Sequence, residues 1–459
     1  MTTKNQSTSI SGNTTQQRTL FRGAFVVTQD PELGEMRGDL LVEGGLIKAV
    51  GASLEATGAE VIDASEFVIL PGFIDTHRHT WQTSLRGLAA GATLEQYQHL
   101  IQGRFGRLFT PEDVYAGNLL GAVSAAQSGI TTLCDESHVQ NSPSHTDAAV
   151  RALKDSGSRA VFDYGWPSID APKWMNNSSL THPTYVAELQ KSAFTEPDAL
   201  VTLRMMLRGP LMTPIEVTKH DLAFARSLGL RSAMHIIGGN IAQLDKNRLL
   251  ASDLMFIHCC DSSDEEIAAV AEAGASISSS PNLELNMSGF GKTPPIRRFL
   301  AAGIRTSLSI DVETSVSGDM FSVMRAALST QTLDDLQMQV GHDQWPRLTP
   351  RDVLGFATID GARACGLDDR VGSITPGKQA DLLMVRMSDA NLAPVEPTSI
   401  VAQIVTSGHP GNVDSVMVSG RFIRRNGKAT NSVAVDRAVE LSRESRARLM
   451  RTAQLATTA

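Results

Sequence analysis

The middle of the chain alternates short apolar runs with longer segments in which apolar residues recur at helical spacing. Pro111–Gln127 is one such helical segment, and 264–272 is another. The apolar runs have the length of strands and lie at 66–74, 129–134, 159–163, 200–206, 231–235, 253–258, 275–279 and 305–310. Eight strands that alternate with helices over roughly 300 residues predict an α/β fold of the (β/α)8 TIM barrel type. A doubly wound open sheet is the alternative.

The two ends of the chain have a different pattern, in which short strands are separated by glycine turns. Residues 39–45 read DLLVEGG, and residues 414–423 read DSVMVSGRFI. Two β-rich ends around a long α/β middle predict one small β-sandwich built from both termini. We assign 19–70 and 372–430 to this sandwich and 71–371 to the barrel.

The outermost segments fit neither part. Residues 1–18 are rich in Ser, Thr, Asn and Gln and have no apolar signal core, so we expect a disordered leader. Residues 431–459 carry charges of both signs at helical spacing, which predicts an exposed C-terminal helix.

The strongest chemical signal follows the first apolar run of the barrel. Residues 71–79 read PGFIDTHRH, so His77 and His79 are two positions apart. Residues two apart on a strand point to the same side, and both imidazoles therefore project together. Two nitrogen donors side by side are what a transition metal requires. A metal in this place favours a hydrolase.

Other metal-capable residues stand at the ends of further predicted strands. His235 ends the fifth strand, His258 ends the sixth, and Asp311 ends the eighth. The second strand ends in the sequence DESH at 135–138. Functional residues of a (β/α)8 barrel gather at the carboxyl ends of its strands. We therefore expect these side chains to meet.

With these residues in place, the chain resembles the amidohydrolase superfamily over nearly its whole length. The likeness rests on the PGFIDTHRH motif at 71–79, on His235, His258 and Asp311, and on the GSITPGKQADL segment at 372–382. It is most similar to the branch of triazine chlorohydrolases and cytosine deaminase-like aminohydrolases, which also have a segment like WQTSLRG at 81–87 after the two histidines.

The resemblance implies one divalent metal per subunit, held by His77, His79, His235 and Asp311. Three imidazoles and a carboxylate suit zinc best, with iron, manganese or cobalt as other possibilities. Binuclear relatives carry a carboxylated lysine at the end of strand four. Residues 201–208 here read VTLRMMLR, so we expect no second metal.

The same resemblance suggests the chemistry. A metal lowers the pKa of its water, Asp311 accepts the proton, and His258 stabilises the developing oxyanion. We expect attack on a non-peptide C–N bond of a small molecule: an amide, urea, carbamate or amino-heterocycle.

One position departs from the pattern of the branch. Many of its aminohydrolases have a glutamate three residues after the strand-five histidine, and here that position is Gly238. Its absence weakens the case for deamination of a nucleobase or triazine ring and slightly favours amides, ureas and carbamates. Glu284, after strand seven, is a candidate replacement. A metal-free, non-catalytic barrel is the alternative of a different class.

Several residues near the predicted ligands have two interpretations. Trp81, Gln82 and His138 are candidates for the substrate pocket. Asp135 and His138 either hold a ligand histidine by a hydrogen bond or cap the next helix.

Composition limits the classes of partner that we expect. The 459 residues have a net charge of -8 and no long basic run, which argues against nucleic acid. No apolar stretch reaches transmembrane length, so we expect no membrane span and a cytoplasmic protein. The expected partner is a small-molecule substrate, and the resemblance implies a homo-oligomer.

Overall fold

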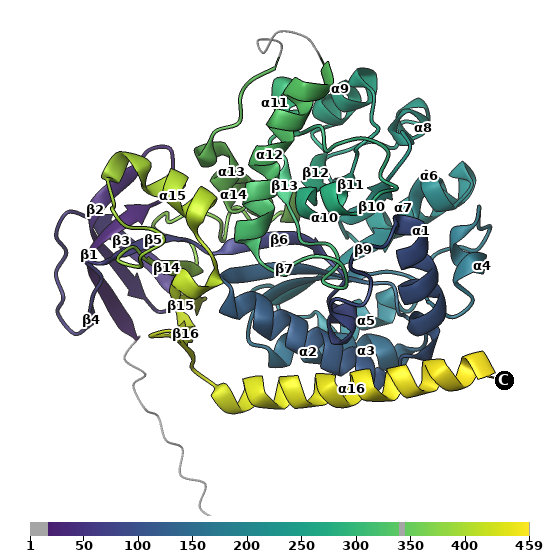
Figure 1. Cartoon of the computed structure of the whole chain (residues 1–459), viewed down its shortest axis with the longest axis horizontal. Helices are drawn as coiled ribbons and strands as arrows, with labels where there is room; N and C mark the ends of the chain where they lie inside the picture. Colours follow the sequence, from purple (N-terminus) through teal and green to yellow (C-terminus); the bar gives the residue numbers. More distant parts are fainter. Residues whose placement is uncertain (1–16, 339–344, 459) are drawn as a thin grey trace, which may run out of the picture.

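The computed structural model describes residues 17–338 and 345–458. The predicted leader 1–18 lies outside the described residues apart from its last two. In Figure 1 a mixed sheet built from both chain ends lies beside a barrel built from the middle of the chain, and the last helix runs along the barrel.

The barrel contains eight parallel strands that pair in sequence order, which confirms the predicted (β/α)8 fold. Its strands are β6 (Phe73–Arg78), β7 (Ile130–Ser137), β8 (Arg159–Tyr164), β9 (Val201–Leu207), β10 (Ser232–Ile236), β11 (Leu254–His258), β12 (Ser276–Ser279) and β13 (Ser307–Leu308). A bridge between Arg78 and Asp311 joins the last strand region to the first and closes the barrel.

Helices connect the barrel strands and cover them (Figure 1). They are η1 (Thr80–Leu85), α1 (Leu94–Tyr97), η2 (Gln98–Phe105), η3 (Gly106–Leu108), α2 (Pro111–Gln127), α3 (Pro143–Asp155), α4 (Ala171–Met175), α5 (Val186–Ala193), α6 (Gly209–Met212), α7 (Ile215–Ser227), α8 (Ile241–Lys246), α9 (Asp264–Ala273), α10 (Pro281–Asn286), α11 (Ile296–Ala301), α12 (Met320–Met338), α13 (Pro350–Phe356) and α14 (Ile359–Cys365).

The start of α2 shows how local sequence sets a boundary. The Thr110 side chain accepts a hydrogen bond from the Asp113 backbone, the Asp113 carboxylate accepts one from the Thr110 backbone, and Pro111 occupies the first turn. This reciprocal capping satisfies backbone donors that a helix start otherwise leaves free.

The mixed sheet has nine strands. They are β1 (Arg18–Val27), β2 (Glu35–Glu43), β3 (Leu46–Gly51), β4 (Glu60–Asp63), β5 (Phe67–Pro71), β14 (Leu382–Arg386), β15 (Val413–Val418), β16 (Arg421–Arg425) and β17 (Lys428–Ala429). The N-terminal and C-terminal strands meet where β5 pairs antiparallel with β14. Between β14 and β15 lie η4 (Pro397–Ser399), α15 (Ile400–Ser407) and η5 (Pro410–Asn412).

The apolar run predicted as one strand at 66–74 is two strands in the structure. Its first part, β5, belongs to the mixed sheet, and the barrel strand β6 begins at Phe73. Gly72 separates them, and a Cβ at this position would lie 2.1 Å from the Thr131 Oγ1 atom. Because only glycine fits against Thr131, the chain passes from one sheet to the other at this residue.

Two contacts attach the peripheral parts to the barrel. The guanidinium of Arg159, at the start of β8, binds the Asp381 carboxylate through two hydrogen bonds of 2.9 and 3.0 Å, and both side chains are buried. The last helix, α16 (Ser432–Thr458), lies against α2, where Ser445 Oγ donates to Asp113 Oδ1 at 2.8 Å.

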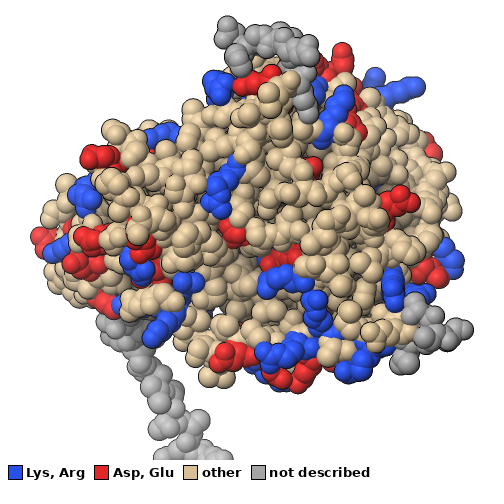
Figure 2. Space-filling model, viewed as in Figure 1, with Lys and Arg blue, Asp and Glu red and all other residues tan. Residues whose placement is uncertain are grey.

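Charges are mixed on the visible surface. Figure 2 shows lysines, arginines and acidic residues interspersed on this face, including the row along α16, without a broad patch of one sign. Within the described residues, we find no helix with the length and apolarity that a bilayer crossing requires.

Candidate active site and metal centre

Barrel closure places three of the predicted site residues together. The Asp311 backbone N–H donates to the His77 carbonyl at 3.0 Å, and the His79 N–H donates to the Asp311 carbonyl at 2.9 Å. Asp311, three residues after the end of the last strand, is thereby inserted between the two histidines that follow from the first strand. This interleaving fixes the three side chains at one end of the barrel.

The Asp311 carboxylate faces imidazole nitrogens. Its Oδ1 atom lies 3.1 Å from His79 Nε2 and 3.4 Å from His77 Nε2, and its Oδ2 atom lies 3.5 Å from His258 Nε2. Burial alone would raise the pKa of Asp311, but these histidines outweigh burial and hold that pKa well below its usual range. Burial lowers the pKa of His77 to about 4. The centre therefore holds an ionised Asp311 carboxylate beside a neutral His77 imidazole.

Two of these residues have strained backbones. His258 has φ 73° and Asp311 has φ 67°. Side chains other than glycine pay on the order of 1 kcal/mol or more for this left-handed conformation. Such strain concentrates at functional sites because it points a side chain where a regular strand would not.

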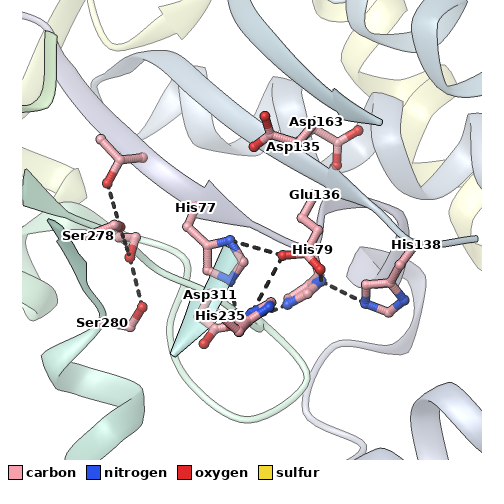
Figure 3. A network of polar contacts seen from close by, with 12 residues as sticks. His77, His79, Asp135, Glu136, His138, Asp163, His235, Ser278, Ser280 and Asp311 are labelled. Carbon is pink, nitrogen blue, oxygen red and sulfur yellow. Dashed lines mark hydrogen bonds and ion pairs between the residues drawn. The ribbon is translucent and has the colours of Figure 1, made fainter. Parts of the chain in front are cut away.

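His235, on β10, reaches the same centre from the other side. Its ring lies 5.0 Å from that of His77 and 5.4 Å from that of His258, measured between centroids. The four predicted ligands lie in one cluster in Figure 3, in two overlapping groups: His77, His79 and His235 with Glu136, and Asp311 with His77 and His258.

Glu136, which belongs to the DESH segment at 135–138, is a site residue to which the sequence analysis assigned no role. It lies on β7, is fully buried, and points at the histidines in Figure 3. With His77, His79 and His235 it forms a group of side chains whose donor atoms all lie within 4.8 Å of one another. Burial, followed by the charge of Asp311, raises the pKa of Glu136 well above its usual range. The period-two alternation of β7, which puts Glu136 on the face opposite Asp135, is the signal that would have found it.

Glu284 lies behind His258. Its Oε1 atom accepts hydrogen bonds from His258 Nδ1 at 2.9 Å and from the Ser280 backbone N–H at 3.0 Å. Glu284 is absent from the pocket lining, so it contacts the centre through His258. Gly238, where a glutamate was looked for, has φ 82° and also lies outside the lining.

His138 and Asp135, whose roles the sequence left open, have separate partners. His138 Nε2 lies 2.9 Å from His79 Nδ1, so one ring nitrogen donates to the other. This contact orients His79 from outside the ligand group. The Asp135 carboxylate accepts from the Thr80 backbone N–H and from the Asn118 side chain, which ties the turn after β6 to α2.

A pocket lies over the centre. His79, Glu136, His235, His258 and Asp311 contribute its polar side, and an apolar wall includes Trp166, Leu283 and Phe290.

The three residues predicted for this pocket, Trp81, Gln82 and His138, are not among those that line it. Trp81 is buried and packs edge-on against Phe109 and His138. Gln82 Nε2 donates to Tyr97 Oη at 2.7 Å, and Tyr97 is the lining residue. Because η1 is packed under α2, its side chains support the wall from behind.

The model of the amidohydrolase family matches residues 68–423, which span the whole barrel and the part of the mixed sheet where β5, β14 and β15 pair. The chain belongs to the amidohydrolase family. This confirms the predicted class of activity, hydrolysis of carbon–nitrogen bonds other than peptide bonds, and supports a divalent metal at the centre.

Curated relatives of this amidohydrolase are deaminases. It is 28% identical over 429 residues to a 5-methylthioadenosine/S-adenosylhomocysteine deaminase of Pyrococcus furiosus, covering 89% of this chain and 96% of the relative. It is 25% identical over 422 residues to a 5'-deoxyadenosine deaminase of Methanosarcina mazei, covering 88% and 92%.

Solved structures share its fold. An adenosine deaminase from Xanthomonas campestris with bound zinc superposes with a TM-score of 0.77 at 22% identity, covering 93% of this chain and 98% of that one. An atrazine chlorohydrolase from Arthrobacter aurescens, complexed with zinc, gives a TM-score of 0.79 at 22% identity, covering 92% and 99%.

Proposed function

We propose that this amidohydrolase is a zinc-dependent aminohydrolase that removes an amino group from a nitrogen heterocycle, such as a purine or triazine ring. The observation that carries the proposal is the convergence of imidazoles and carboxylates on a pocket that is also lined by apolar and aromatic side chains. A flat ring packs against such a wall while its amino-bearing carbon faces the polar side. The names of the curated relatives support a heterocyclic substrate.

The residues present fit a metal. Among the residues that the structure describes, neither ring nitrogen of His77 has a hydrogen-bond partner, and His235 Nδ1 has none either. Buried nitrogens without partners are rare unless an ion satisfies them. We infer that His77, His79, His235 and Asp311 hold one zinc ion. When bound, the metal lowers the pKa of a water molecule towards neutral and acts as a Lewis acid.

Each of the side chains around the metal has a separate role in the reaction. Asp311, ionised and facing the pocket, accepts the proton of the attacking water and passes it to the leaving nitrogen. His258 lies beside Asp311 and stabilises negative charge as it develops on the substrate. Glu284 accepts from His258 Nδ1 and so fixes the orientation of that ring.

Gly238 supports a second substrate class. With no carboxylate at that position, protonation of a ring nitrogen lacks its usual donor, and amides, ureas and carbamates need no such step. A substrate screen distinguishes the two classes. We expect ammonia release from aminopurine nucleosides or amino-triazines. Turnover restricted to amides, phenylureas or carbamates would overturn the heterocycle proposal.

Asp311→Asn tests the mechanism. Because the amide cannot accept a proton, we expect kcat to fall by about 10³-fold or more, the loss typical of a missing general base combined with a weakened ligand. Circular dichroism should show an intact fold. Asp198→Asn, at an exposed carboxylate, is the matched control and should keep full activity. An active Asp311→Asn enzyme that contains a full complement of metal would refute the assigned role.

A further inference from the structure

Arg78, which stands between the two histidines of the first barrel strand, is a fully buried cation. Its backbone pairs with that of Asp311 in the bridge that closes the barrel. Its Nη1 atom donates to Asp75 Oδ2 at 3.3 Å, and its Nη2 atom lies 2.8 Å from Glu313 Oε2. Both carboxylates are buried. One guanidinium therefore binds an acid of β6 and an acid of the segment after β13.

These two acids hold the chain on either side of Asp311. The Asp75 Oδ1 atom accepts a hydrogen bond from the Ile310 backbone N–H at 3.0 Å, and Ile310 immediately precedes Asp311. Glu313 lies two residues after Asp311. Arg78 is thus attached to the residue before Asp311 through Asp75 and to a residue after it through Glu313.

Glu313 is also fixed from a second direction. The Thr83 hydroxyl donates to its Oε2 atom at 2.9 Å, and Arg86 Nε donates to its Oε1 atom at 3.1 Å. The Gly87 backbone N–H donates to the Glu313 carbonyl at 3.1 Å. The segment after Asp311 is therefore attached to η1 and its following turn, which come directly after the two histidines.

These contacts matter because the backbone of Asp311 is strained. Its φ of 67° lies in the left-handed region, and a residue other than glycine stays there only where surrounding contacts fix it. The hydrogen bonds of Asp311 to the backbones of His77 and His79 hold its peptide groups. Asp311 cannot relax towards an extended conformation without also moving Ile310 and Glu313, and both are held by way of Arg78.

We propose that Arg78 is a positioning residue for the reaction, which acts with Asp75 and Glu313 to hold the Asp311 carboxylate against the imidazoles. The proposal rests on the proposed function, because it takes Asp311 as the group that accepts the proton. Arg78, Asp75 and Glu313 are not among the described residues that line the pocket, so they act through Asp311 and not on the substrate.

Arg78→Lys tests this role. Lysine keeps the positive charge, but it offers one nitrogen where the guanidinium binds two acids through two. We expect kcat to fall about 10- to 100-fold, the loss that a displacement of about 1 Å causes at a reacting group. KM should stay within about twofold, because the pocket lining is unchanged. The visible absorption spectrum of the cobalt-substituted protein should also change, since Asp311 is a proposed ligand.

Glu313→Gln is a milder second variant, in case Arg78→Lys does not fold. Glutamine keeps the size of the side chain and still accepts from Thr83 and Arg86, while its contact with Arg78 loses the negative charge. We expect kcat to fall about tenfold with KM again unchanged, because a neutral partner holds the guanidinium less tightly.

Arg159→Lys is the matched control. It makes the same substitution at another buried arginine that binds a buried carboxylate, and it does so at the start of β8, at the opposite end of the barrel strands from the site. Its Tm should fall, but the folded enzyme should keep parental kcat and the parental cobalt spectrum. This comparison separates the loss of a buried ion pair from a displacement of Asp311.

The outcomes distinguish the two proposals. If folded Arg78→Lys and Glu313→Gln enzymes keep parental kcat and the parental cobalt spectrum, Arg78 only neutralises two acids, and the positioning role is overturned while the proposed function stands. An equal loss of kcat in Arg159→Lys also overturns it. If the parent protein binds no zinc after reconstitution and hydrolyses no substrate, the proposed function and the positioning role fail together.

Discussion

The hydrogen bond between Glu284 and His258 makes a quantitative prediction about turnover. Glu284→Gln keeps the size of the side chain and removes its charge. The bond of 2.9 Å to His258 Nδ1 changes from charge-assisted to neutral, and the bond to the Ser280 N–H changes in the same way. The energy difference between the charged and the neutral hydrogen bond is not screened by solvent, because the Glu284 carboxylate is shielded from water.

The magnitude follows from these bonds. Hydrogen bonds to charged groups contribute about 1.5–3 kcal/mol, and neutral bonds about 0.5–1.5 kcal/mol. If the transition state loses about 1.5 kcal/mol of stabilisation through His258, kcat falls roughly tenfold. The loss grows towards 10²-fold if the amide lets the ring turn. KM should stay within about twofold, because Glu284 does not line the pocket.

Steady-state kinetics on the best substrate of the screen provide the assay. Glu265→Gln, at an exposed glutamate of α9, is the control and should retain parental kcat. Unchanged kcat in a folded, metal-replete Glu284→Gln enzyme would show that Glu284 does not act through His258. A loss of metal or of folded protein in parallel with activity would also refute this reasoning.

Three further predictions concern stability and metal. Chelation should abolish activity and lower the Tm, and added zinc should restore both; a Tm and an activity that chelation leaves unchanged would instead indicate a metal-free barrel. Arg159→Met should lower the free energy of unfolding by about 3–5 kcal/mol in urea titrations, since it leaves Asp381 buried without its partner, and a double variant with Asp381→Leu should recover most of the loss. Burial, helped by Arg208, lowers the pKa of His182 to about 4. The unfolded chain binds this proton below about pH 6.5, so His182 stabilises the fold above that pH and the stabilisation is lost as pH falls towards 4. His182→Gln should remove up to about 3 kcal/mol of that pH dependence.

The sequence alone determined the class of fold and most of the centre. Local apolar periodicity predicted eight strands and the helices between them, since the period of a segment depends on neighbours along the chain. The spacing of His77 and His79 predicted two donors on one side of a strand for the same reason. His235, His258 and Asp311 were predicted to join this site because the carboxyl ends of barrel strands lie at the same end of the barrel.

Tertiary structure decided what depends on contacts between distant segments. The run at 66–74 looks like one strand, and only the pairing of β5 with β14 assigns its first half to the other sheet. The sequence around Glu284 does not show whether its side chain faces substrate or supports His258. The hydrogen bond from His258 to Glu284, which joins β11 to α10, selects the second. Glu136 becomes a site residue only because β7 extends to Ser137 and because the histidines of β6 and β10 lie around its side chain. The charge of a buried side chain is compensated by groups from other strands, and a linear sequence does not place those groups.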